Sequence, residues 1–242
     1  MLVQQQQAIA HAMVLSASMT DKRFARFPLR SKVNSYWIAR YCGLVGWAGF
    51  DYPSTSGWTS QSMKTIGVFD VFRSPKFGAL PYAATVRAFT LEPSFYWDLE
   101  PTRASNYSLR LLGKEALVWS DADRVELSVD GGAFLLRLEP ARGDWRFAHM
   151  PHPPFVADFT PFLAQRDTNA NANGANAELM ITGFWDKAAT TRSKRFASDV
   201  ALMRFQVTVD AKDGEVFHAD GSDSARLVLQ VVDGHGVATV VN

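Results

Sequence analysis

The sequence predicts a mixed fold, in which a strand–loop–helix segment near the amino end is followed by antiparallel β-sandwich strands. The first observation is the apolar run 44–50, whose lack of polar alternation is typical of a strand buried on both faces. The second is the polar loop, rich in Pro, Ser, Thr and Gly, that follows this run. The third is a change after Ala88 to short segments separated by Gly, Asp and Pro, which indicates a sandwich.

A helix is expected over Leu2 to Met19, before Thr20 and Asp21 end it. Apolar residues recur there at helical spacing among good helix formers, namely Ile9, Ala12, Met13 and Ala17. The segment 26–42 that follows is basic and aromatic and matches neither of its flanks. It is either a genuine extended loop or translated non-coding sequence, and its composition favours the second reading.

The apolar run 44–50 ends at Asp51, and after the loop Phe72, Pro75 and Lys76 are expected to open a second helix, with Pro75 in its first turn. Strand, loop and helix in this order form the repeating unit of (β/α)₈ barrels. Residues at the carboxyl end of a barrel strand face the active site. Trp47 and Asp51 are therefore expected at a catalytic mouth.

The later strands are predicted from alternation and turn residues. In 124–129 the residues Val125, Leu127 and Val129 share one face, Asp130-Gly131-Gly132 is a hairpin signal, and 134–138 is the return strand. Further strands are expected at 116–120, 178–185, 201–209, 225–232 and 236–241. The low-complexity polar segment 168–177 is expected to be a loop outside the core.

The composition excludes several classes of function. A formal charge of +1 gives no electrostatic footprint for nucleic acid or an anionic membrane, and no apolar run approaches the ~20 residues that span a bilayer. Cys42 is the one cysteine, and the five histidines fall in different segments, so we expect neither a disulfide, a metal nor a cofactor. The chain is expected to be soluble, and its compartment is not indicated.

Two motifs lie around the polar loop, GWxxFDY at 46–52 and GVxDxFRxPK at 67–76. They are similar to the last barrel strand and helix of glycoside hydrolase family 2, above all of its β-galactosidase-like members. The residues 4–12 resemble the penultimate barrel helix, 92–98 and 118–127 the following β-sandwich, and 219–223 with 232–234 the start of an immunoglobulin-like domain. The resemblance implies a barrel portion at 1–90, a β-sandwich domain at 91–197 and the start of an immunoglobulin-like domain at 198–242.

The lengths of these pieces imply a carboxyl-terminal fragment. A whole barrel takes roughly 250 residues, and an immunoglobulin-like domain about 100, so both ends are expected to be cut inside domains. The partners that the resemblance implies are a carbohydrate substrate and the missing amino-terminal portion of a parent enzyme, for which a secreted or periplasmic location is open.

The catalytic chemistry of such an enzyme is expected to lie outside this chain. Retaining glycosidases use two carboxylates ~5–5.5 Å apart, and in the family one of the two catalytic glutamates follows an asparagine. The chain has no Asn-Glu pair, and its glutamates all follow the barrel segment: Glu92, Glu100, Glu115, Glu126, Glu139, Glu178 and Glu215. We therefore assign no catalytic residue and expect the chain alone to be inactive.

Trp47 and Asp51 are the two candidate substrate-binding residues. An indole at the end of a barrel strand offers a flat apolar face to a pyranose, and the resemblance implies that Trp47 forms a wall of the sugar subsite; core packing is the alternative. Asp51 points to the same side if the strand persists. It could accept hydrogen bonds from sugar hydroxyls, cap the loop or pair with Arg73.

The residues before Gly67 favour a neutral sugar. The β-glucuronidases of the family carry Asn-x-Lys there to hold the uronate carboxylate, whereas this chain has Lys64 and Ile66 at those two positions. An acidic sugar would lose its charge-assisted partner, so a β-galactoside or similar neutral β-glycoside is expected. Two other readings remain open: a non-catalytic carbohydrate-binding or adhesive sandwich module, and an inactive gene-model fragment.

Overall fold

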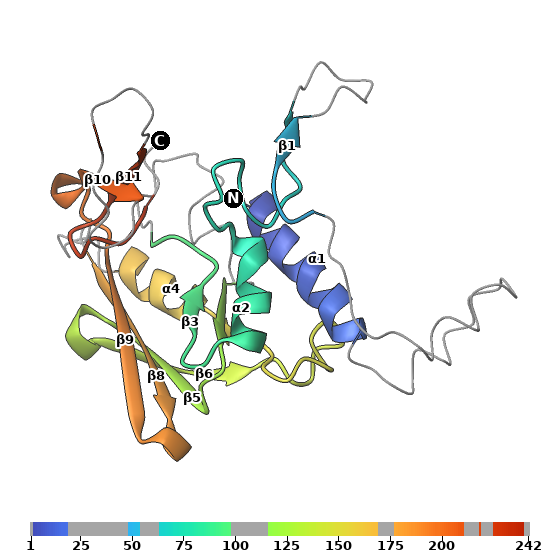
Figure 1. Ribbon diagram of the computed structural model, residues 1–242. Coiled ribbons are helices and arrows are strands. Elements are labelled where there is room, and N and C mark those ends of the chain that lie inside the picture. Colours follow the sequence, from blue (N-terminus) through green and yellow to red (C-terminus); the bar gives the residue numbers. More distant parts are fainter. Residues whose placement is uncertain are drawn as a thin grey trace, which may run out of the picture.

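The computed structural model describes residues 2–18, 48–53, 63–97, 116–168, 177–210, 218 and 225–239 (Figure 1). Trp47, the greater part of the predicted strand 44–50, the segment 26–42 and most of the predicted loop 168–177 lie outside these residues. The described part is mostly β-structure, with helices packed against both faces of a large curved sheet (Figure 1).

The predicted first helix is confirmed as α1 (Leu2–Ser18). Its buried side includes Ala8 and Ala12, which are fully buried, and Leu15. Small side chains at these positions let the helix pack closely on the short helices that follow residue 76. The Gln7 side chain also donates from Nε2 to the carbonyl oxygens of Ile66 and Gly67, at 2.7 and 2.9 Å.

Two portions of the chain, residues 48–53 and 63–69, are joined by backbone hydrogen bonds and together form what is called the crossing. β1 (Tyr52–Pro53) pairs antiparallel with β2 (Met63–Lys64). Phe50 and Phe69 form a parallel bridge, and the Phe69 amide donates to the Gly49 carbonyl oxygen at 2.9 Å. The (β/α)₈ barrel portion expected at residues 1–90 stays a prediction.

The second helix begins later than predicted. A short 3₁₀ turn, η3 (Phe77–Ala79), leads into α2 (Leu80–Val86), and Pro81 rather than Pro75 lies in the first turn of the α-helix. Pro75 instead forms an antiparallel bridge with Phe69. The cause is a turn at 70–74, where the Asp70 carboxylate accepts the amides of residues 72 and 74 and the chain reverses before the helix starts.

Seven antiparallel strands form the main sheet, in the order β3-β4-β7-β6-β5-β8-β9. Their bounds are β3 (Leu91–Pro93), β4 (Ala116–Ser120), β5 (Arg124–Val129), β6 (Phe134–Pro140), β7 (Phe155–Ala157), β8 (Glu178–Trp185) and β9 (Thr190–Ala197). The first part of β6 pairs with β5 and its last two residues pair with β7. The sheet is nearly closed, since Lys194 on β9 lies 2.6 Å from Glu92 on β3.

The strands predicted at 116–120, 124–129 and 178–185 are confirmed, as is the hairpin turn η5 (Asp130–Gly132). They lie in one sheet, and the β-sandwich domain predicted at 91–197 stays a prediction. Val125, Leu127 and Val129 are fully buried on one face, as their alternation predicts. Neither β9, which follows the turn η6 (Asp186–Ala188), nor α4 (Thr160–Thr168) was predicted. The α4 side chain of Phe162 packs against Trp97 in the core inside the sheet.

Strand β4 separates two hydrophobic cores. Ala116 and Val118 point into the core inside the curved sheet, whereas Leu117 and Trp119 point into a second core shared with α1 and α2. All five residues of β4 are therefore buried. The contacts on both faces of β4 fix the helical segment against the sheet.

A separate two-stranded sheet lies at the carboxyl end. After the turn η7 (Val200–Leu202), β10 (Arg204–Asp210) pairs antiparallel with β11 (Arg226–Val232), close to the strands predicted at 201–209 and 225–232. In the described part of the predicted strand 236–241, Ala238 makes a single bridge to Val232 and no strand forms. The immunoglobulin-like domain predicted here stays a prediction.

None of the described helices is both long and apolar enough to cross a membrane.

Candidate functional site

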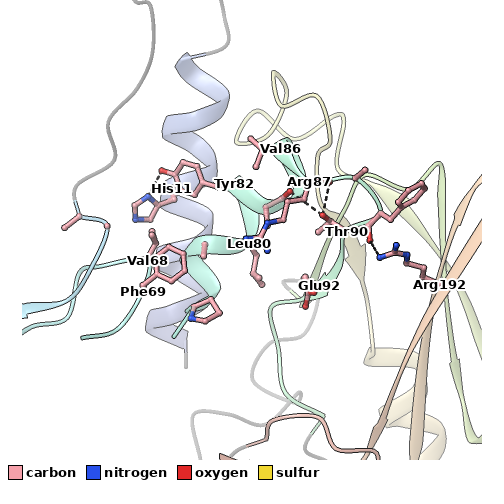
Figure 2. Close-up of a pocket in the computed structure, with 17 residues that line it drawn as sticks. His11, Val68, Phe69, Leu80, Tyr82, Val86, Arg87, Thr90, Glu92 and Arg192 are labelled. Carbon is pink, nitrogen blue, oxygen red and sulfur yellow. Dashed lines mark hydrogen bonds between the residues drawn. The ribbon is translucent and has the colours of Figure 1, made fainter. Parts of the chain in front are cut away.

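A cleft of about 780 Å³ opens between α1, α2 and the start of β3 (Figure 2). One wall is built by Ala48 and Gly49 with Val68 and Phe69, the two chain portions joined by the parallel bridge. Ala48 and Gly49 follow Trp47 directly in the sequence, so this wall begins next in sequence to the residue for which a sugar contact is predicted. Its volume lies within the roughly 300–1,000 Å³ of small-molecule sites.

Two polar rings meet on one side of this cleft. His11 on α1 and Tyr82 on α2 are joined by a hydrogen bond of 2.9 Å between Nδ1 and the hydroxyl oxygen, and their rings meet edge-on (Figure 2). Burial, and secondly the positive charge of Lys76, lower the pKa of His11 below its usual range, and burial raises the pKa of Tyr82. Both groups are therefore neutral near pH 7, which suits a structural hydrogen bond or contact with a neutral ligand.

The opposite side of the cleft is the connection between α2 and β3. Phe89 has a left-handed backbone with a φ of 59°, which is unusual for a bulky side chain. The amides of Phe89 and Thr90 donate to the Asp121 carboxylate at 2.9 and 2.7 Å. Arg192 donates to the Phe89 carbonyl oxygen at 3.3 Å (Figure 2). These contacts hold the strained connection in place.

The described lining does not contain a glycosidase pair of carboxylates. Among the residues that the structure describes around the cleft, Glu92 is the one carboxylate, and it is paired with Lys194. Glycoside hydrolysis by the usual route needs a second carboxylate. Within the same described ranges, no three His, Cys, Asp or Glu residues come together as a metal site would require.

Asp51 is engaged in protein contacts beside this cleft. Its Oδ1 accepts the Gly67 amide at 2.8 Å and the Lys76 ammonium at 2.8 Å, and its side chain is 9% exposed. The cation is Lys76 rather than Arg73, whose guanidinium lies over the Phe50 ring at 5.6 Å. Of the alternatives that the sequence left open, the structure shows Asp51 capping the loop; a sugar contact through Asp51 stays a prediction.

Sequence reasoning missed the residues that complete this arrangement. Lys76 stands 25 positions after Asp51 and donates at 3.0 Å to the Thr65 carbonyl oxygen as well. His11 and Tyr82 are separated by 71 positions. No local sequence pattern predicts contacts between residues so far apart in the chain. These contacts arise only when α1, the crossing and α2 pack together.

The chain is similar to several curated proteins named β-galactosidase. It is 29% identical over 208 residues to one from Thermoanaerobacter pseudethanolicus, a match that covers 83% of this chain and 25% of the relative. One from Rhizobium meliloti is 29% identical over 199 residues, covering 80% and 24%, and one from Thermoanaerobacterium thermosulfurigenes is 24% identical over 211 residues, covering 86% and 28%. The chain thus spans about a quarter of the length of the curated relatives it matches.

The solved structures that resemble the chain include β-glucuronidases. One from Parabacteroides merdae is 15% identical, with a TM-score of 0.39 and coverage of 78% of this chain and 21% of that one. β-Glucuronidase 3 from Bacteroides uniformis is 14% identical, with a TM-score of 0.34 and coverage of 73% and 20%. At these scores the overlap does not establish a shared fold. No protein-family model matches the chain.

The β-galactosidase resemblance recognised in the sequence is confirmed by the curated relatives. Their partial coverage fits a carboxyl-terminal fragment of a glycosidase of this kind.

Proposed function

We propose that the chain forms the carboxyl-terminal portion of a retaining glycoside hydrolase that acts on β-galactosides or similar neutral β-glycosides. The observation that carries this proposal is the 29% identity over 208 residues to a protein named β-galactosidase. The matched length includes most of the chain, so the likeness does not rest on one short motif.

The contribution of this portion is to build and hold one wall of the sugar subsite. Trp47 would present its indole face to the pyranose. The contacts of Asp51 with Gly67 and Lys76, and those of Gln7 with Ile66 and Gly67, anchor the chain on both sides of the crossing that follows Trp47. Asp51 would add a hydrogen bond to a sugar hydroxyl only if the substrate reaches its carboxylate.

The residues near Gly67 support a neutral substrate. Lys64 lies in β2, opposite Tyr52. Ile66, which is 42% exposed, is an uncharged side chain at the position where an acidic sugar would need a cation. The Lys76 ammonium is already bound to the Asp51 carboxylate and the Thr65 carbonyl oxygen. A uronate at this position would gain no charge-assisted hydrogen bond from Lys76 without breaking those contacts.

The acid/base and the nucleophile would come from the rest of the parent enzyme. Loss of both carboxylates removes the two chemical steps together, so the chain of 242 residues is proposed to be inactive alone.

The test compares the chain with a longer protein that also includes the coding sequence preceding Met1 at its locus. We expect the longer protein to hydrolyse nitrophenyl β-galactoside in preference to the β-glucuronide, and the chain of 242 residues to give no turnover above a blank. Turnover by the chain alone, abolished by a substitution within it, would contradict the fragment proposal. Preference for the glucuronide would contradict the substrate proposal.

The same experiment separates the alternatives. A carbohydrate-binding sandwich module would have no upstream barrel strands and no pair of catalytic glutamates, yet the chain would bind sugar. A gene-model fragment would show an intron at 26–42 or an interrupted reading frame, and a corrected gene would restore activity.

A further inference from the structure

A second cleft, of about 390 Å³, adjoins the first. Three parts of the chain meet there: the residues 74–80 before and within α2, the seam between β3 and β9, and the carboxyl-terminal residues 230–239. Pro75, Leu80 and Glu92 border both clefts, so the two are neighbours. A volume of this size is sufficient for a small ligand.

The charged groups around the second cleft are already paired. Lys76 lies 2.8 Å from Asp51, and Lys194 lies 2.6 Å from Glu92. The buried Asp233 carboxylate accepts the backbone amides of residues 197, 235 and 237 at 2.8–2.9 Å. An ionic ligand would have to break one of these contacts to be neutralised, so the lining favours a neutral ligand.

The remaining surface combines an aromatic wall with groups that can both donate and accept. Phe77 and Tyr96 pack with ring centroids 5.3 Å apart, and both border the cleft. The Lys194 and Glu92 side chains are 37% and 38% exposed, so water or a ligand hydroxyl can reach them. Gln230 is exposed at the rim and supplies an amide donor and acceptor.

We propose that this second cleft binds a neutral saccharide unit, at a site separate from the first cleft. The aromatic wall takes the C–H face of the sugar ring, while Gln230, Lys194 and Glu92 bind its hydroxyls. A sugar held here is not hydrolysed, because the lining described has one solvent-accessible carboxylate and that carboxylate is paired. The site would hold a distal residue of a longer glycan or an independent mono- or disaccharide.

The proposal is tested by titrating the full chain with methyl β-galactoside, lactose, glucuronate and inorganic phosphate. Binding is followed by calorimetry and by the NMR signals of the Gln230 side-chain amide and the Tyr96 ring. We expect saturable binding of the two neutral sugars, weaker binding of glucuronate and none of phosphate. This binding does not depend on catalysis, so its failure is distinguishable from failure of the proposed hydrolase function.

Matched variants locate the site. Gln230→Ala should weaken binding about fivefold, the effect of one lost hydrogen bond. Its control is Gln206→Ala on the paired strand β10, opposite Gln230 in register, which should leave the affinity unchanged. Lys194→Met should also weaken binding, and Arg195→Met, one position along β9, should not. Thermal unfolding of each variant confirms that it is folded.

Three results would overturn the proposal. The first is a folded chain that binds neither neutral sugar saturably. The second is unchanged affinity in both Gln230→Ala and Lys194→Met. The third is loss of binding in His11→Gln with retention in Gln230→Ala, which would place the sugar in the first cleft instead.

Discussion

The Asp51 carboxylate and the Lys76 ammonium lie 2.8 Å apart with side chains only 9% and 12% exposed. Together with the Gly67 amide and the Thr65 carbonyl oxygen, they tie the chain after Trp47 to the residue just before the second helix. The pair is buried enough for loss of one partner to leave a charge poorly compensated.

Breaking this pair should be costly on either side. We expect Asp51→Asn and Lys76→Met each to lower the free energy of unfolding by ~2–3 kcal/mol, somewhat below the range for fully buried pairs. The double variant should cost less than the sum of the two singles. Urea unfolding measures the stability of all three variants. The control is Glu126→Gln, which breaks a more exposed ion pair with Arg124 at 3.5 Å and should cost under ~1 kcal/mol. Equal costs for Asp51→Asn and Glu126→Gln would refute the structural importance of the pair.

Gly67 should not tolerate a side chain. A Cβ built there would lie 2.2 Å from the Phe50 carbonyl carbon and 2.3 Å from the Asp51 amide nitrogen, so the backbone crossing itself would have to open. Gly67→Ala is therefore expected to destabilise the chain by several kcal/mol or prevent folding, by overpacking. Gly49→Ala is the control, because nothing lies within 4 Å of its Cβ position. Comparable thermal unfolding of the two variants would show that the crossing is not formed as described.

The neutral His11 should make stability depend on pH. Since its pKa is lowered from 6.5 in the folded chain, the unfolded chain binds a proton more readily, and stability falls as the pH drops below about 6.5. The loss of stability ends once the pH has fallen below the lowered pKa of His11. His11→Gln should reduce the difference in melting temperature between pH 7.5 and 5.5, whereas His149→Gln, on an exposed loop, should not. An unchanged difference in His11→Gln would mean that His11 is not buried in its neutral form.

The hairpin of β10 and β11 should promote association. The register places Val207 opposite Leu229 and Val209 opposite Leu227, and with Phe205 these side chains are 53–79% exposed on one face. Exposed apolar strands are prone to associate. Val207→Thr with Leu229→Thr should lower binding of a hydrophobic dye and raise solubility, while Val228→Thr on the other face should do neither. Equal dye binding in all variants would exclude this face as its source.

The fold was predictable where the sequence alternates and where turn residues mark the ends. Val125, Leu127 and Val129 show this, because one face of β5 is buried and the turn at Asp130 reverses the chain. β9 was missed because its residues from Thr190 to Arg195 carry no apolar alternation: its cations bind Glu92 and the Phe89 carbonyl oxygen at the seam. α4 had a usable start signal, since Asp158 accepts the Thr160 amide at 3.0 Å and Pro161 follows.

The site was less predictable than the fold. Asp51 could be recognised as a loop residue, but its partner Lys76 depends on how the crossing packs. Trp119 was predicted in the strand 116–120, and that strand is confirmed. The Trp119 ring packs against Phe147 in the second core, which is shared with α1 and α2. Strand alternation specifies which side chains share a face, but not what covers that face.

Trp47 provides the most direct test of the account, through kcat/KM for a neutral aryl β-galactoside in the longer protein. If its indole stacks on the sugar, Trp47→Ala should lower kcat/KM about a hundredfold, or ~3 kcal/mol, with little change in the free energy of unfolding. The control is Trp119→Phe, at a fully buried position whose indole nitrogen makes no hydrogen bond to the residues that the structure describes. It should lower stability by ~1–2 kcal/mol and leave kcat/KM nearly unchanged. If Trp47→Ala instead costs stability while kcat/KM stays intact, Trp47 is core packing and the proposed sugar subsite is contradicted.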